Sequence, residues 1–101
     1  MDRIKKFTLL VGLNDKDTKT RIINKNKAKQ TIMDICGDCT VSEAIGQYTH
    51  DDGTTVTEKS LRVEILFKEL EEVISYCNEI KKELNQESVA LSCTYEDSML
   101  V

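Results

Sequence analysis

Residues 61–95, LRVEILFKELEEVISYCNEIKKELNQESVALSCTY, join a strand pattern, a helix pattern and a second strand pattern. Apolar and other residues alternate over residues 61–67, as in a strand that buries one face. Over residues 70–84 the apolar residues recur at intervals of three and four, which predicts an amphipathic helix. Alternation returns over residues 89–95. This part of the chain therefore predicts a strand, a helix that packs on a sheet, and a last strand.

The first part of the chain shows the same order of patterns. Residues 7–11 alternate as a half-buried strand, and a polar loop follows them. Asn24 is suited to cap a helix over residues 25–36, and Gly37 is suited to end it. We therefore expect a strand, a loop and a second amphipathic helix before residue 40.

Between these parts, residues 40–50 have the composition of a strand, and Asp52 and Gly53 form a strong hairpin signal. Gly46 in this strand indicates either a bulge or a close approach by another backbone or a ligand. The complete order predicts an α+β fold of the ferredoxin-like βαββαβ type. In this fold a four-stranded antiparallel sheet carries both helices on one face, and its first and third strands lie at the centre.

The opposite face of this sheet has no helix to cover it. It is expected to carry a mixture of small, polar and apolar side chains: Thr8, Leu10, Arg62, Glu64, Leu66, Ala90, Ser92 and Thr94. Such a face suits a ligand or a second copy of the chain, and we expect a homo-oligomer. The alternative is a monomer whose sheet face is solvated.

Length and charge limit the classes of protein. The 101 residues predict one domain over residues 1–95 and a tail over 96–101. No apolar run approaches the ~20 residues of a membrane helix, and no signal peptide is evident, so we expect a cytoplasmic protein without membrane partners. The net charge of -4 argues against bulk nucleic-acid binding. Residues 1–30 nevertheless hold nine basic and three acidic residues, which indicates either an anion site or solvated lysines.

Cys36 and Cys39 have the CxxC spacing of redox and zinc sites. They close a predicted helix, whereas a reactive thiol gains from a helix start. A zinc ion would need two more ligands, yet Cys77 and Cys93 fit the apolar stripes of their own elements. Packing is therefore favoured, and we expect neither a metal nor a cofactor.

His50, Asp51 and Asp52 could form an acid and base cluster, but acidic residues at such a turn more often serve its geometry. No phosphate-binding glycine loop, zinc-protease motif or catalytic triad signature occurs in the chain. These observations predict a protein that is not an enzyme.

Gln86, Glu87 and Ser88 follow the end of the second predicted helix, where Asn85 is suited to the left-handed conformation that caps it. These polar residues either protect an exposed sheet edge or bind a polar small molecule. In the second case Arg62 or a lysine of the basic part would meet the anionic group of the ligand.

Four segments, FTLLVGLNDKDTK, GQYTHDDGT, LRVEILF and LNQESVA, resemble small uncharacterised phage and prophage proteins of Gram-positive bacteria. They are also distantly similar to a bacterial domain family of unknown function with a closing QESV. The resemblance implies an accessory protein of phage origin that acts by binding. The residues that we expect to contact a ligand are Asn14, Lys16, Tyr48, Arg62, Gln86, Glu87 and Ser88.

The resulting hypothesis is a non-enzymatic anti-defence protein in the host cytoplasm. As a homo-oligomer it would sequester an anionic small molecule such as a cyclic nucleotide immune signal. The alternative is an inhibitor or adaptor that blocks a host protein through the open sheet face or the C-terminal tail.

Overall fold

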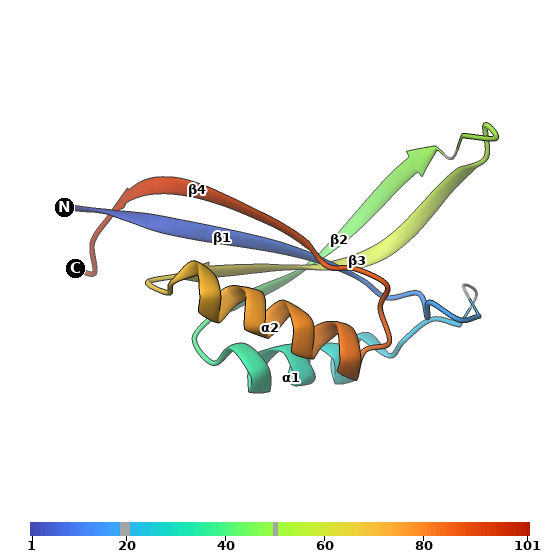
Figure 1. Ribbon diagram of the computed structural model, residues 1–101, viewed down its shortest axis with the longest axis horizontal. Coiled ribbons are helices and arrows are strands. Elements are labelled where there is room, and N and C mark those ends of the chain that lie inside the picture. Colours follow the sequence, from blue (N-terminus) through green and yellow to red (C-terminus); the bar gives the residue numbers. More distant parts are fainter. Residues whose placement is uncertain (19–20, 50) are drawn as a thin grey trace.

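The computed structural model describes residues 1–18, 21–49 and 51–101, and only the backbone of Tyr48. The elements are β1 (Asp2–Gly12), α1 (Lys25–Cys36), β2 (Thr40–Thr49), β3 (Thr55–Leu66), α2 (Leu70–Glu83) and β4 (Ala90–Ser98). The strands form one sheet in the order β2-β3-β1-β4, and every neighbouring pair is antiparallel. Both helices lie on the same face of this sheet (Figure 1). The predicted ferredoxin-like fold is confirmed.

The core lies between the helices and the two central strands. Leu9 of β1 pairs with Val63 of β3, and both side chains are fully buried. Alternation along each strand puts their neighbours Phe7 and Ile65 on the same face, where Ile32 of α1 packs among the buried residues. Side chains one position away must then point to the open face. The strand pattern of the sequence therefore decides which residues a ligand on that face can reach.

Each helix ends where the sequence predicted. The Asn24 Oδ1 atom accepts a hydrogen bond of 3.0 Å from the Lys27 amide, and Gly37 ends α1 with a φ of 71°. Asn85 follows α2 with a φ of 48°. The Gln86 amide donates to the Lys81 carbonyl at 2.9 Å, and the Asn85 amide donates to the Lys82 carbonyl at 3.5 Å. This pattern is the Schellman motif, so the expected left-handed cap is confirmed.

Two details of the sequence prediction are wrong, and one alternative is excluded. Phe67 lies beyond β3 with a φ of 62°, and its side chain is 53% exposed because the chain turns there towards α2. The last strand continues to Ser98, so residues 96–98 pair with residues 2–4 and do not belong to a tail. Of the two alternatives for Gly46, the bulge is excluded because β2 pairs with β3 in unbroken register from Thr40 to Thr49, and a close approach by a ligand stays a prediction.

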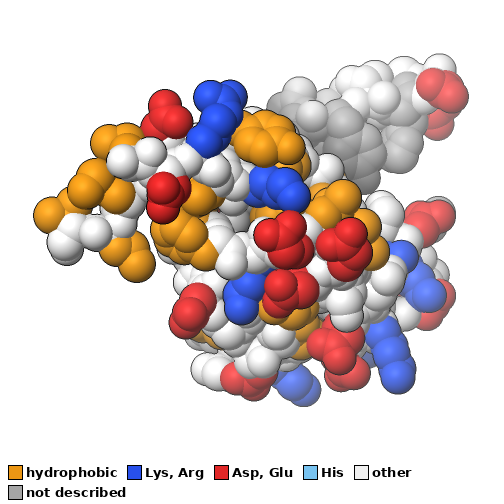
Figure 2. All heavy atoms as spheres, turned by 60° about the vertical axis from the view of Figure 1, so that its left-hand side comes forward, with side chains coloured by type: hydrophobic (Ala, Val, Ile, Leu, Met, Phe, Trp, Pro, Cys, Tyr) orange, Lys and Arg blue, Asp and Glu red, His pale blue; other side chains and the backbone are white. Residues whose placement is uncertain are grey.

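Basic residues of the first part pair with acidic residues of the second. Lys25 on α1 contacts Glu43 at 2.7 Å, and Lys5 on β1 contacts Glu69 at 3.1 Å. Figure 2, which brings the end with the two termini forward, shows acidic and basic side chains interspersed and hydrophobic ones gathered to one side. The excess of lysine in the sequence therefore does not form a basic surface on this face.

Neither helix in the described parts of the chain is long and apolar enough to cross a membrane.

Candidate functional site

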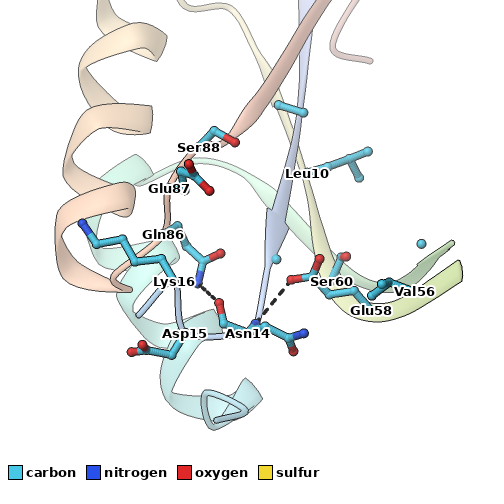
Figure 3. Close-up of a pocket in the computed structure, with 13 residues that line it drawn as sticks. Leu10, Asn14, Asp15, Lys16, Val56, Glu58, Ser60, Gln86, Glu87 and Ser88 are labelled. Atoms are coloured by element: carbon cyan, nitrogen blue, oxygen red, sulfur yellow. Dashed lines mark hydrogen bonds between the residues drawn. The ribbon is translucent and has the colours of Figure 1, made fainter. Parts of the chain in front are cut away.

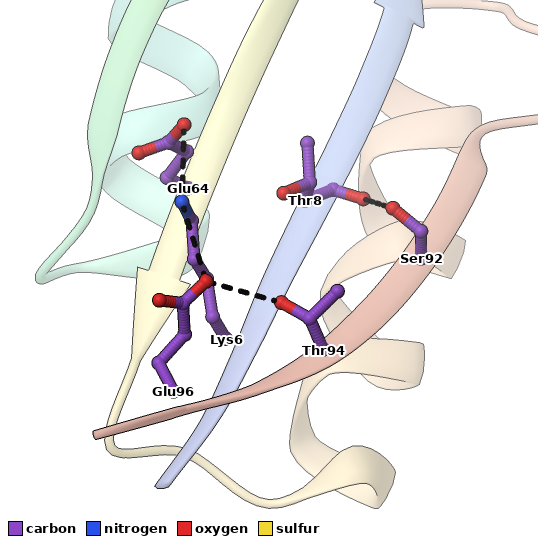
Figure 4. Close-up of polar contacts among 6 residues, drawn as sticks. All are labelled: Lys6, Thr8, Glu64, Ser92, Thr94 and Glu96. Atoms are coloured by element: carbon purple, nitrogen blue, oxygen red, sulfur yellow. Dashed lines mark hydrogen bonds and ion pairs between the residues drawn. The ribbon is translucent and has the colours of Figure 1, made fainter. Parts of the chain in front are cut away.

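The open face of the sheet has two different halves. In the half nearer the termini, the Lys6 ammonium lies 3.8 Å from Glu64 and 4.0 Å from Glu96 (Figure 4). Ser92 donates a hydrogen bond of 3.4 Å to the carbonyl of Thr8. Polar side chains therefore contact one another across this half.

The other half contains an open cavity of about 660 Å³ (Figure 3). Its floor consists of open-face residues of all four strands: Leu10, Gly12, Gly46, Val56, Glu58, Ser60 and Ala90. Its walls are residues 14–16, which leave β1, and residues 86–88, which lead into β4. The cavity thus lies where the two loop segments meet the open face.

The absence of a side chain at Gly12 leaves room for two polar groups. A Cβ atom at this position would clash with the Glu58 Oε1 atom and would lie 3.2 Å from the Gln86 Oε1 atom. Glu58 comes from β3 and Gln86 from the segment after α2, and Figure 3 shows their side chains flanking the end of β1. The same Glu58 oxygen accepts a hydrogen bond of 3.4 Å from the Asn14 amide.

Gln86 connects the two walls of the cavity. Its side chain is only 8% exposed, and its Nε2 group donates to the Asn14 carbonyl at 2.9 Å and to the Leu84 carbonyl at 3.1 Å. A buried amide needs such partners because burial removes its bonds to water. The Oε1 atom remains on the side of the cavity, as Figure 3 shows.

Asn85 fixes the loop after β1 in the same way. Its Nδ2 group donates to Asp15 and to Asp17, both at 2.9 Å, and its carbonyl accepts from the Lys16 amide at 3.1 Å. The hydrogen bond from Asn85, followed by those from the amides of Thr18 and Asp17, lowers the pKa of Asp15. The carboxylate is therefore the form that holds this loop together.

The lining of the cavity is acidic. Among the described residues that line it, Asp15, Glu58 and Glu87 are acidic and Lys16 is the one basic residue. Such a lining disfavours an anion and favours a ligand with net positive charge. This is the opposite of the charge that the lysine-rich first part of the sequence indicated.

The expected ligand contacts are only partly gathered here. Five of them, Asn14, Lys16, Gln86, Glu87 and Ser88, line the cavity, so the segments 14–16 and 86–88 meet as the hypothesis requires. Arg62 is exposed on the open face but does not line the cavity. The side chain of Tyr48 lies outside the described residues. Their role in binding stays a prediction.

The sequence prediction does not include Glu58, because the clear alternation of apolar residues in this strand begins at Leu61. Extending its alternation backwards from Arg62 places Ser60, Glu58 and Val56 on the open face. Counting across the hairpin then pairs Glu58 with Gly46, as the structure does.

The other two candidate clusters lie elsewhere. Cys36 is buried at the end of α1, and this burial raises the pKa of its thiol to about 12, which opposes a reactive thiolate. The described residues hold no group of three or more His, Cys, Asp or Glu that could bind a metal. Asp52 accepts a hydrogen bond of 2.8 Å from the Thr54 amide, as expected of a turn residue. This hydrogen bond lowers the pKa of the Asp52 carboxyl. His50 lies outside the described residues.

No protein-family model and no curated protein matches the sequence. Among solved structures, the chain is similar to a phage SAM lyase in complex with S-methyl-5′-thioadenosine, with 27% identity and a TM-score of 0.64 over 90% of this chain and 80% of that chain. The apo state of a phage SAM lyase matches with 26% identity and a TM-score of 0.60 over 90% of this chain and 79% of that chain. GlnK of B. subtilis in complex with ATP shares the fold, with 16% identity and a TM-score of 0.57 over 93% and 82% of the two chains.

These similarities correct the expectation that the protein is not an enzyme, because a SAM lyase is one. They fit a phage protein that binds a small molecule.

Proposed function

We propose that this protein is a phage lyase that cleaves S-adenosylmethionine (SAM) and releases S-methyl-5′-thioadenosine. The observation that carries the proposal is the 27% identity to a phage SAM lyase over 90% of the chain. The cavity of about 660 Å³ is large enough for a ligand of this class.

The charge of the cavity supports this substrate over the cyclic nucleotide that we first expected. SAM carries a sulfonium and an ammonium group against one carboxylate, so it is a cation. Three acidic residues and one lysine line the cavity, and they favour such a cation over a phosphate ester. Leu10, Val56 and Ala90 offer apolar surface for the adenine ring.

The reaction places few demands on the side chains of the protein. S-methyl-5′-thioadenosine keeps the methyl and adenosyl groups, so the bond that breaks joins the sulfur to the amino-acid part of SAM. The substrate's own carboxylate can attack this carbon and form a five-membered lactone. The bonding pair then goes to sulfur, the sulfonium becomes a neutral thioether, and no proton is transferred.

The contribution of the protein to such a reaction is to hold the substrate in the reactive conformation. Well-oriented intramolecular reactions reach effective molarities of about 10⁵–10⁸ M. Glu87 and Lys16 are suited to bind the ammonium and carboxylate groups, because they bring opposite charges to the two walls of the cavity. The two loop segments that carry them are connected by Gln86.

The test is to incubate the purified protein with SAM and to follow S-methyl-5′-thioadenosine by liquid chromatography and mass spectrometry. S-adenosylhomocysteine is the matched control, since it lacks the sulfonium leaving group and should remain intact. In water enriched in ¹⁸O, a lyase gives an unlabelled lactone at early times, whereas hydrolysis labels the four-carbon product. If no S-methyl-5′-thioadenosine forms, the proposed function is wrong.

The proposal includes the expected anti-defence role, because loss of SAM deprives the host of its methyl donor. It also keeps the homo-oligomer as a prediction. Leu66 lies on the open face outside the cavity with 37% of its surface exposed, and a second copy could cover it.

A further inference from the structure

Two acceptor oxygens share one small volume at the floor of the cavity. The Oε1 atoms of Glu58 and Gln86 both approach the point where Gly12 would carry its Cβ atom. The backbone of Gly12 does not have a left-handed φ, so the glycine is not needed for its conformation. We infer that its role is to leave this space open.

The Gln86 oxygen is fixed as an acceptor. Both hydrogens of its Nε2 group are directed to backbone carbonyls, those of Asn14 and Leu84. A flip of the amide would lose both bonds, so the oxygen must stay towards the cavity. Within residues 1–18, 21–49 and 51–101, with the Tyr48 side chain left aside, no protein donor bonds to it, although the side chain is only 8% exposed.

The Glu58 carboxylate, next to the Gln86 oxygen, can accept further hydrogen bonds. Its one hydrogen bond from a described residue is the bond of 3.4 Å from the Asn14 amide, and it forms no ion pair with a described cation. A carboxylate accepts up to about four hydrogen bonds. The pair therefore offers acceptors without donors, and it suits a ligand group that brings two donors on neighbouring atoms.

We propose that Glu58 and Gln86 bind the 2′- and 3′-hydroxyl groups of the ligand's ribose. This inference rests on the proposed function and names the part of the substrate that the floor of the cavity recognises. A vicinal diol presents two O–H donors side by side, and acidic side chains are established partners of ribose hydroxyls. The diol is present in both SAM and the thioadenosine product, whereas the product has lost the ammonium group.

Isothermal titration calorimetry with S-methyl-5′-thioadenosine and its 2′-deoxy and 3′-deoxy analogues tests the assignment. Removal of a hydroxyl that bonds to these acceptors should weaken binding to the wild-type protein by about tenfold or more. Glu58→Gln removes the charge with little change of shape, so it should lower this discrimination severalfold.

Gly12→Ala tests the open space at the floor of the cavity, and Ser42→Ala is its control. The first puts a methyl group against Glu58 and Gln86, so it should bring the ratio of ribose to deoxyribose affinity to about one. The second changes a side chain that is exposed on β2 and does not line the cavity, so the ratio should persist. Melting temperatures report whether each variant is folded, and if Gly12→Ala is not, the wild-type protein and Glu58→Gln decide the question.

Equal affinity of the wild-type protein for all three nucleosides would overturn the assignment, and so would a failure of all three to bind. Cleavage of SAM in either case would leave the proposed function standing. Discrimination by the ribose hydroxyls without cleavage would refute the lyase and support the assignment.

Discussion

The substitution Gln86→Leu tests whether the hydrogen bonds of the Gln86 side chain stabilise the fold. In the wild-type protein its Nε2 group donates to the Asn14 and Leu84 carbonyls at 2.9 and 3.1 Å, and the side chain is buried. Leucine has a similar size but no donor. The Leu84 carbonyl would then lose its partner in a buried place, and the Asn14 carbonyl in a partly buried one.

The expected loss follows from these two carbonyls. An acceptor that loses its partner on burial costs about 1–3 kcal/mol, and leucine recovers part of this through its apolar surface. We expect the free energy of unfolding to fall by about 2–4 kcal/mol. For a domain of this size that corresponds to a decrease in melting temperature of roughly 10–30 °C. The domain should still fold, since typical stabilities are about 5–15 kcal/mol.

Equilibrium unfolding in guanidinium chloride, followed by circular dichroism, measures the change. Gln47→Leu is the matched control, because Gln47 is exposed on β2 and the same substitution there should stay within about 0.5 kcal/mol. If the two variants lose the same stability, the hydrogen bonds of Gln86 do not hold the walls of the cavity together.

Three further predictions concern charge, thiols and assembly. Hydrogen bonds lower the pKa of the Asp15 carboxyl from its usual value of 3.8. The carboxylate should therefore stabilise the fold fully above pH 3.8, and this stabilisation should be lost as the pH falls through the lowered pKa. Melting temperatures of the wild-type protein and Asp15→Asn should differ at pH 7 and converge in acid. Burial raises the pKa of the Cys36 thiol to about 12, so mass spectrometry after iodoacetamide at pH 8 should find the exposed Cys93 modified well before Cys36; equal rates would contradict the buried position. Native mass spectrometry of the wild-type protein should find more than one subunit, and Leu66→Asp should shift the distribution towards the monomer. If the wild-type protein is itself a monomer, the open face is not a contact between copies.

The fold was predictable because local signals agree with one another along the chain. The alternation around Leu61 and Val63 specifies a strand, and the spacing from Leu70 onward specifies the helix that covers it. Asn85 adopts the left-handed conformation that its side chain tolerates. Phe67 departs from its pattern because a positive φ at the end of β3 depends on how the chain enters α2, which alternation does not encode.

The candidate site was only partly predictable, because it depends on pairing between distant segments. Gln86 and Asn14 could be named from their motifs, yet the hydrogen bond that joins them spans most of the chain. Glu58 reaches the cavity only through the register of the hairpin and the missing side chain of Gly12. The charge of the site was misjudged because lysines such as Lys25 pair with acidic residues away from the cavity.

The wrong expectation about enzymatic activity has a chemical explanation under the proposed reaction. Catalytic motifs are recognisable when a protein supplies a nucleophile, a base or a metal, because each needs particular residues at a fixed spacing. In SAM the nucleophile and the leaving group are both parts of the substrate. A protein that accelerates their reaction needs only a cavity of suitable charge and shape, and its residues are chosen for binding. The cluster at the floor of the cavity, Glu58 and Gln86 beside Gly12, consists of such binding residues. It therefore matches no catalytic motif in the sequence and is recognised only in the three-dimensional structure.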